Sequence, residues 1–335
     1  MTTALTRRAF AATGLAATGL AAVGFATAGL TARAANAAPT EIRIDWATYN
    51  PVSLVLKDQG LLEKEFAADK IGVRWVFSAG SNKALEYLNA SSLDFGSSAG
   101  AAALIAKINS NPIKSIYVYS RPEWTALVTK GDSPINTVAD LKGKRVAVTR
   151  GTDPHIFLVR ALAGAGLSVK DITMVLLQHQ DGKLALERGD VDAWAGLDPL
   201  MAAAEIEGGA RLFYRKPEAN TWGVLNVRED FSRENPEIVR RVLKTYEEAR
   251  KWAIGNPEKL RALMVGVTKL SDAVIAKQLN ERTDMSSGMI GQPQADSIIA
   301  AGKALQEAGV LPADVDVTAV TNKMIDPSFI RSLAA

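Results

Sequence analysis

The chain has 335 residues, of which 47% are hydrophobic and 22% are charged, a balance typical of a packed globular protein. Its 39 Lys and Arg residues nearly match its 36 Asp and Glu residues, and no cluster joins basic to aromatic residues, which argues against a nucleic-acid-binding surface. The absence of cysteine excludes disulfides, thiolate nucleophiles, cysteine metal sites and lipid attachment through an N-terminal cysteine.

The N-terminal segment has the features of an export signal. A twin-arginine pattern at 6–11 precedes an Ala- and Gly-rich apolar run to Leu30, and Ala35-Asn-Ala37 fits the small-x-small cleavage rule. We predict that residues 1–37 are a twin-arginine signal peptide, that the mature chain starts near Ala38 and that it resides in the periplasm. An uncleaved membrane anchor is the alternative, but the regularly spaced glycines of this run make a poor permanent span.

Strand and helix patterns alternate along the mature chain as far as residue 227. This alternation is typical of an α/β fold with a mostly parallel sheet covered on both faces. We expect strands at 41–46, 72–77, 93–96, 113–119, 124–129, near 146–148, 172–177, 192–196 and 224–227. We expect helices at 51–66, 81–88, 99–108, 154–165, 183–188, 236–253, 257–266, 271–283 and 292–308, with only helices after 227.

The two halves of this pattern are weak repeats of one another. Residues 88–94 match 186–192, and each stretch leads from a helix into a short strand. This favours two α/β lobes around a ligand cleft, although chance similarity of helix-strand units is the alternative. A strand followed by a helical tail cannot easily build its own sheet. We therefore predict one lobe of residues 40–121 plus 223–335 and a second of 122–222, joined by two crossover segments that form a hinge.

Ligands of open α/β sheets bind beyond the carboxyl ends of the strands, so the loops there supply the candidate site. The stretch 144–155 predicts a strand, a glycine turn and a helix start, which together form a receptor for an anion, with an ordinary βα connection as the alternative. The candidate loops carry neutral polar residues that are also typical of turns and helix caps. The candidates from these loops are Thr48, Tyr49, Asn50, Gly80, Ser81, Ser98, Gly151, Thr152 and His155.

Four further residues stand near the ends of strands or at the predicted crossings. Trp46 and Trp222 would wall a cleft for an organic tail, or would be core aromatics. Arg121 is the candidate for a direct charge partner, unless it forms a surface salt bridge with Glu123. Asp198 either contacts the ligand or caps the following helix.

The sequence offers two possible kinds of reactive site, a metal site and a serine hydrolase site. The chain has two histidines, too few for a convincing zinc site, so we expect neither a metal nor a cofactor. Residues 96–100 fit the G-x-S-x-G pattern of a serine hydrolase with Ser98 as nucleophile, Asp153 as acid and His179 as base. About half of the chain follows His179, which is unlike that fold, and this function remains a distant alternative.

Several segments resemble the periplasmic substrate-binding proteins of ABC importers for aliphatic sulfonates, a group related to those for nitrate and taurine. The resemblance spans the mature chain to about Asn235. It rests on Ile44-Asp-Trp-Ala-Thr-Tyr-Asn50, Gly60-Leu-Leu-Glu-Lys64, Ala90-Ser-Ser-Leu-Asp-Phe-Gly96, Val138-Ala-Asp-Leu-Lys-Gly-Lys144, Gly189-Asp-Val-Asp-Ala-Trp194 and Asp198-Pro199.

The resemblance implies a type II periplasmic binding protein fold, without catalytic activity, that closes on a small organic anion. It also implies delivery of that anion to a membrane permease with its ATPase subunits, and we expect a monomer. The ligand contacts would come from 48–50, Ser81, Ser98, 151–155 and the Asp198 region. Nitrate, taurine, an aromatic carboxylate or a pyrimidine are the alternative ligands. The sequence departs from the family at 195–198, which lacks a second aromatic residue and leaves the length of the ligand tail open.

Overall fold

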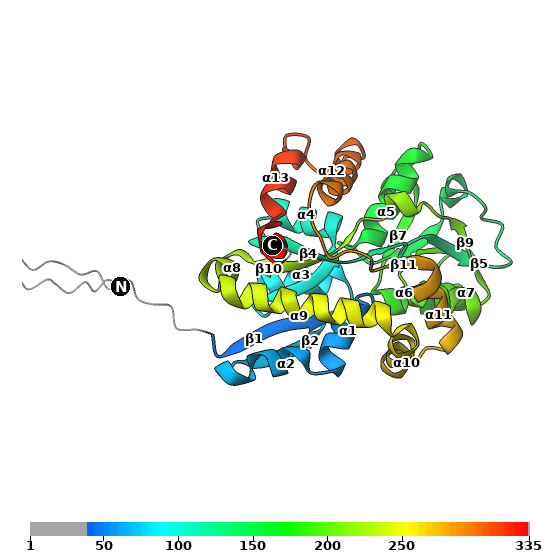
Figure 1. The fold of residues 1–335 in the computed structure, drawn as a ribbon. Coiled ribbons are helices and arrows are strands. Elements are labelled where there is room, and N and C mark those ends of the chain that lie inside the picture. The colour runs from blue at the N-terminus through cyan, green and yellow to red at the C-terminus, as the bar shows by residue number, and fades with distance from the viewer. Residues whose placement is uncertain (1–38, 334–335) are drawn as a thin grey trace, which may run out of the picture. The chain divides into compact units, whose positions relative to one another are not determined.

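The structure is a computed structural model that describes residues 39–333 (Figure 1). The predicted signal segment and its cleavage site lie outside the described residues. The described chain contains two β-sheets with helices packed around them. Within residues 39–333, no helix combines the length and hydrophobicity that crossing a membrane requires.

The first sheet has six strands in the order β11-β4-β10-β3-β1-β2. Strand β1 is parallel to β2 and β3, whereas β10 is antiparallel to β3 and β4. Ile42 and Ile44 of β1 and Phe95 of β3 are fully buried in its core. The strands are β1 (Glu41–Trp46), β2 (Gly72–Phe77), β3 (Phe95–Ala99), β4 (Ile113–Pro122), β10 (Gly223–Arg228) and β11 (Thr283–Asp284).

The second sheet has five strands in the order β7-β6-β8-β5-β9. Strand β6 is parallel to β7 and β8, whereas β5 is antiparallel to β8 and β9. Val146 and Val148 are fully buried here, as the strand prediction for this stretch requires. The strands are β5 (Leu127–Lys130), β6 (Arg145–Val148), β7 (Thr173–Leu176), β8 (Ala193–Ala195) and β9 (Ala210–Tyr214).

The two sheets share one strand order. The order β2-β1-β3-β10-β4 in the first sheet corresponds to β7-β6-β8-β5-β9 in the second. In each sheet the antiparallel strand at the fourth position of this order is the one that follows a passage of the chain from the other sheet, β5 after β4 and β10 after β9. The predicted α/β fold with two sheets is confirmed, and both sheets are mostly parallel apart from β5, β10 and β11.

The predicted repeat of helix and strand also has one local geometry in both sheets. Asp94 accepts a hydrogen bond from the main-chain N–H of Arg43 at 2.8 Å, and Asp192 accepts one from the main-chain N–H of Arg145 at 2.7 Å. In each case the arginine lies on the strand at the second position of the shared order, β1 or β6, and the aspartate precedes the strand at the third position, β3 or β8. The carboxylate thus fixes the neighbouring strand at the same place in both units.

The helices surround the sheets, and one of the late helices reaches the second sheet. Helix α11 follows β10 of the first sheet but contacts α7, beside which it lies in Figure 1, whereas α10 contacts α1, α9 and α11. The helices are α1 (Pro51–Asp58), α2 (Leu61–Phe66), α3 (Ser81–Asn89), α4 (Gly100–Ile108), α5 (Asp153–Gly164), α6 (His179–Arg188), α7 (Leu200–Ile206), α8 (Glu229–Glu234), α9 (Pro236–Gly255), α10 (Pro257–Thr268), α11 (Asp272–Arg282), α12 (Gln292–Glu307), α13 (Val317–Met324) and α14 (Ser328–Arg331).

Two expectations about elements were wrong. The single helix expected at 51–66 is two helices, because Gly60 adopts the left-handed conformation with φ of +57°. The expectation of helices alone after 227 missed β11, whose two residues are too few to show a strand pattern. No bounds were predicted for the helix after Asp198, which is α7, or for β9, which is half-buried along its length rather than alternating.

Candidate functional site

A small buried cavity lies where three helices begin. We call it the inner cavity; its volume is about 10 Å³, the space of one water-sized sphere. Three predicted site residues, Tyr49, Ser81 and Thr152, meet here although they come from both sheets. The lining residues are Tyr49, Ser81, Trp124, Thr152, Asp153, Pro154, His179 and Leu197.

The first residues of α3, α5 and α6 all line the inner cavity. These residues are Ser81, Asp153 and His179. The first turn of a helix has N–H groups without intrahelical partners and carries the positive end of the helix dipole. Three such ends around one space favour an anion there. The Ser81 hydroxyl accepts a hydrogen bond from the Ala99 N–H at 3.0 Å, so its own proton is left for another partner.

The inner cavity offers this positive potential without cationic side chains. None of the described residues that line it is Lys or Arg. Burial lowers the pKa of His179 to about 3. Burial, and then the charge of Arg150, lower the pKa of His155 to about 4. Both histidines are therefore neutral at neutral pH, and an anion would be held by dipoles and neutral donors.

Asp153 ties the start of α5 to both passages of the chain between the sheets. Its buried carboxylate accepts hydrogen bonds from Trp124 Nε1 at 2.8 Å and from the Thr221 N–H and hydroxyl at 2.9 and 2.8 Å. Burial raises the pKa of Asp153, and these donors act against that rise. The carboxylate is thus occupied by the protein and is a structural group of the cavity wall.

The loops of the two sheets touch each other around the inner cavity. A Cβ atom added to Gly80 would lie 3.0 Å from His179 Nε2, and one added to Gly151 would lie 3.6 Å from Asn82 Cβ. Gly151 also has φ of +77°, which a side chain rarely allows. The two predicted glycines therefore lie where the sheets' loops meet, with no room for a side chain at Gly80.

Trp46 and Thr48 line a second, larger cavity next to the inner one. We call it the outer cavity; its volume is about 440 Å³. His179 lines both cavities. The rings of Trp46 and Phe77 pack with their centroids 4.7 Å apart, and Phe77 is 46% exposed. The lining residues are Trp46, Thr48, Phe77, Ala79, Gln178, His179, Gln180, Pro199, Leu200, Val267, Thr268 and Leu270.

Asn50 and Ser98 lie behind the inner cavity rather than in its lining. Asn50 accepts a hydrogen bond from the Ser53 N–H at 3.2 Å, as a cap of α1, and donates one to the Ser97 hydroxyl at 2.8 Å. The Ser98 hydroxyl accepts one from Asn226 Nδ2 at 2.8 Å and donates one to the Ala99 carbonyl at 3.1 Å. Both residues are fully buried and brace β3.

The same contacts bear on the hydrolase alternative. A serine nucleophile needs a hydroxyl that is exposed on its turn and bonded to a histidine. Ser98 is instead fully buried within β3, and in the described part of the chain neither histidine is bonded to it. This geometry does not favour the hydrolase.

Arg121 and Trp222 lie next to one another outside both cavities. The Arg121 guanidinium carbon lies 5.1 Å from the centroid of the Trp222 ring, and Arg121 is exposed. The suggested salt bridge between Arg121 and Glu123 is replaced by one between Glu123 and Arg215, with two N···O distances of 2.8 Å. A ligand contact by Arg121 stays a prediction.

Asp198 has the helix-capping role that was the alternative to ligand contact. It precedes a cis bond to Pro199, and its carboxylate accepts a hydrogen bond from the Ala202 N–H at 2.9 Å. It also pairs with the buried Arg282 at 3.2 Å. Burial raises the pKa of Asp198 to about 6 against the lowering effect of Arg282. A direct role of Asp198 in ligand binding remains untested.

Sequence reasoning missed three residues that line the inner cavity, Trp124, His179 and Leu197. Asp153 and Pro154 fall within the segment 151–155 that the resemblance implied, whereas His179 was named only for the hydrolase and Trp124 and Leu197 were assigned to a strand and a loop. His179 and Leu197 each lie in a segment that follows a predicted strand, and that position was the available signal for them. Trp124 carried no such signal, because a buried apolar residue beside a cavity looks like any core residue in a sequence.

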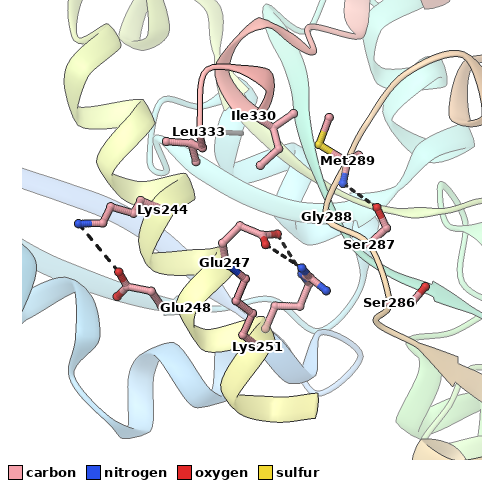
Figure 2. A pocket seen from close by; sticks show the side chains of 11 residues that line it. Lys244, Glu247, Glu248, Lys251, Ser286, Ser287, Gly288, Met289, Ile330 and Leu333 are labelled. Carbon is pink, nitrogen blue, oxygen red and sulfur yellow. Dashed lines mark hydrogen bonds and ion pairs between the residues drawn. The ribbon is translucent and has the colours of Figure 1, made fainter. Parts of the chain in front are cut away.

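A third cavity lies away from all the predicted site residues. Its volume is about 480 Å³, and it lies between α9, the segment before α12 and the end of α14 (Figure 2). Four of its charged side chains form two pairs: Lys244 lies 4.0 Å from Glu248, and Arg250 lies 2.7 Å from Glu247. Within residues 39–333 no cluster of His, Asp and Glu has the makings of a metal site.

Comparison with known proteins places the chain in a family. A family model described as NMT1/THI5 like matches residues 65–260, more than half of the chain. The chain belongs to this family. A relative from Escherichia coli (strain K12), named an aliphatic sulfonates-binding protein, is 32% identical over 253 residues, which cover 75% of this chain and 79% of the relative.

Solved structures of the family share the fold. The alkanesulfonate-binding protein SsuA from Xanthomonas axonopodis pv. citri, bound to MOPS, has a TM-score of 0.78 at 26% identity and covers 86% of this chain and 98% of its own. The periplasmic aliphatic sulphonate binding protein SsuA from Escherichia coli has a TM-score of 0.73 at 28% identity, and the match covers 87% of this chain and 94% of that protein. The expected resemblance to sulfonate-binding proteins and the periplasmic binding protein fold are both confirmed.

Proposed function

We propose that this protein is the substrate-binding component of an ABC importer and captures a small organic anion, most simply an aliphatic sulfonate. The observation that carries the proposal is the meeting of three helix N-termini, from both sheets, around one cavity without Lys or Arg in its lining. The names of the relatives from Escherichia coli and Xanthomonas axonopodis support the choice of a sulfonate.

The chemistry of a sulfonate matches this set of donors, and the loops must part to admit the ligand because the cavity as it stands holds one water-sized sphere. A sulfonate keeps its charge throughout the physiological pH range and has three acceptor oxygens, so a dry site must supply several donors. Helix N–H groups and the Ser81 hydroxyl are neutral donors from different loops, and they surround one point only when the loops approach each other. Ligand binding then favours the closed state through the contacts that exist only in that state. The organic tail would lie in the outer cavity, against Trp46 and Phe77.

The proposal includes two lobes with the boundaries expected from the sequence, 40–121 plus 223–335 and 122–222. The division of the strands supports it, since β5 to β9 form the second sheet and the other strands form the first. The passages between β4 and β5 and between β9 and β10 would be the hinge. We further propose export by the twin-arginine signal, residence in the periplasm as a monomer, and delivery of the ligand to a permease with its ATPase subunits.

Binding without catalysis completes the proposal, and calorimetry tests it. The full chain is titrated with alkanesulfonates, taurine, nitrate, sulfate, an aromatic carboxylate and a pyrimidine. We expect a saturable heat signal with one ligand bound per chain for a sulfonate. We also expect to recover that sulfonate chemically unchanged from the calorimeter cell. Tighter binding of nitrate, a carboxylate or a pyrimidine would move the assignment to that ligand. Silence across the panel, or conversion of the ligand, would contradict the proposal.

A further inference from the structure

The side chain of His179 is held in one tautomer by its neighbours. The Thr149 hydroxyl donates its single proton to the Leu177 carbonyl at 2.8 Å. The same hydroxyl oxygen lies 3.1 Å from His179 Nδ1. Both contacts are hydrogen bonds at once only if the hydroxyl donates to the carbonyl and Nδ1–H donates to Thr149 Oγ1. Neutral His179 therefore carries its proton on Nδ1 and has a lone pair on Nε2.

That lone pair has no partner in the structure. His179 is 2% exposed, and its Nε2 atom is buried without a hydrogen bond within residues 39–333. His179 lines both the inner and the outer cavity. A buried acceptor without a donor costs free energy of folding, and a donor on a bound ligand would remove that cost.

Two side-chain amides near His179 also have an oxygen without a partner within residues 39–333. The position of a Cβ atom on Gly80 is 3.0 Å from His179 Nε2 and 2.9 Å from Asn82 Oδ1, so both atoms pack against Gly80. Asn82 Oδ1 is buried without a partner among the described residues, and so is Gln178 Oε1 on the wall of the outer cavity. An amide can present either its oxygen or its NH2 group to a ligand, whereas His179 Nε2 in this tautomer can only accept. An acceptor repels an anionic group, so His179 Nε2 is not suited to the charged end of a sulfonate.

We propose that the ligand carries a hydrogen-bond donor, an ammonium or a hydroxyl, close to its anionic group, and that His179 Nε2 accepts from it. The proposal rests on the proposed function, since it describes the rest of the same ligand. His179 is then a specificity-determining residue that separates substituted sulfonates from simple alkanesulfonates. Thr149 is a positioning residue, since it acts by fixing the tautomer.

Three sulfonates of nearly equal size test the proposal: propanesulfonate, 2-hydroxyethanesulfonate and 2-aminoethanesulfonate. We expect at least one of the two donor-bearing ligands to bind the full chain about tenfold or more tightly than propanesulfonate, because a site with an unpaired acceptor rejects the analogue without the donor. Equal affinities, or preference for propanesulfonate, would overturn the inference and leave the proposed function standing. If none of the three binds, both fail.

The variant Thr149→Val removes the acceptor that fixes the tautomer. We expect the preference for the donor-bearing ligand to fall to less than about threefold, because the Nε2–H tautomer becomes accessible. The matched control is Thr129→Val, since the Thr129 hydroxyl makes the same kind of bond, to the Asp192 carbonyl at 2.9 Å, in the other part of the sheet. A purely structural role for Thr149 would lower all three affinities together and leave their ratio unchanged.

Two direct measurements decide between this proposal and the uptake of a solvent proton by His179 when the anion binds. Nitrogen chemical shifts of the two histidines, in the free and bound chain, should show the Nδ1–H tautomer for His179. Calorimetry at pH 7 in buffers of different ionisation enthalpy should show no proton uptake on binding. An Nε2–H tautomer, or uptake of one proton, would mean that His179 donates to the anion and would refute the inference.

Discussion

The two histidines show how burial changes the chemistry of a residue. In solution a histidine titrates near neutral pH, but His179 and His155 are 2% and 8% exposed and their pKa values are lowered to about 3 and about 4. The loss of hydration penalises the charged imidazolium, and no described carboxylate compensates for it at His179. The proposed anion site therefore lies beside a histidine that stays neutral.

The variant His179→Gln tests this effect on stability. The unfolded chain binds a proton at His179 below pH 6.5 while the folded chain does not until about pH 3, so this residue destabilises the fold as pH falls from 6.5 to 4. Between pH 6.5 and pH 4 the free energy of unfolding should therefore fall by roughly 2–3 kcal/mol less in the variant than in the wild type, at about 1.4 kcal/mol for each pKa unit.

Urea unfolding at a series of pH values between 4 and 7 provides the measurement. The pKa values of Asp45 and Asp198 are raised to about 6, so these two residues stabilise the fold as pH falls, opposite to the effect of His179. They do so equally in the wild type and the variant, so their contribution cancels in the difference between the two curves. His155→Gln serves as the comparison and should flatten the curve less, because its pKa is lowered less. Parallel curves for wild type and His179→Gln would contradict the prediction.

At the scale of elements, α5 is the helix that connects the site to the passages between the sheets. Its first residue, Asp153, accepts three hydrogen bonds from residues that lie 29 and 68 positions away in the sequence. Two of its neighbours, Thr152 and Pro154, line the inner cavity. A change in the position of α5 therefore moves the cavity wall and the hinge together.

The variant Asp153→Asn tests this connection. An amide has one acceptor oxygen where the carboxylate has two, so at least one of the buried donors loses its partner, which costs about 1–3 kcal/mol in the free energy of unfolding. Asp140→Asn is a matched control, because the exposed Asp140 carboxylate also accepts three hydrogen bonds, all from neighbours in the sequence. Denaturant unfolding should show a clearly smaller loss for the control. An equal loss would mean that Asp153 acts only as a local helix cap.

At the scale of the whole molecule, the contact between Gly80 and His179 is the place where the loops of the two sheets meet. Gly80 follows the first sheet's β2 and His179 follows the second sheet's β7, and no room for a side chain is left between them. The backbone of Gly80 is extended, with φ of 172°, so a larger residue is opposed by this contact rather than by backbone strain.

The variant Gly80→Val should therefore oppose closure while each sheet still folds. Overpacking of 1–3 kcal/mol corresponds to roughly five- to 150-fold weaker ligand binding, with little change in the thermal unfolding of the free chain. Calorimetry measures the affinity, and small-angle scattering with and without ligand measures compaction. Gly164→Val is the control, because a Cβ there meets nothing within 4 Å. Unchanged affinity in Gly80→Val would show that ligand binding does not need this contact.

The sequence by itself determined the order of strands and helices, the weak internal repeat and the loops that could hold a ligand. These features depend on periodicity, turn residues and helix caps, which are properties of neighbouring residues. The stretch 144–155 is an example: Val146 and Val148 are buried in β6, Gly151 has a positive φ, and Pro154 lies in the first turn of α5.

Only the tertiary structure decided which polar groups face the cavity and which are used elsewhere. The carboxylate of Asp198 pairs with Arg282, 84 residues away in the sequence, and the side-chain amide of Asn226 donates a hydrogen bond to the hydroxyl of Ser98, 128 residues away. Such partners carry no signal in a local pattern, because a hydroxyl or carboxylate in a loop looks the same whether it caps a helix, braces a strand or points at a ligand. The lone pair of His179 became a candidate for recognition only once Thr149 and Leu177 were placed beside it.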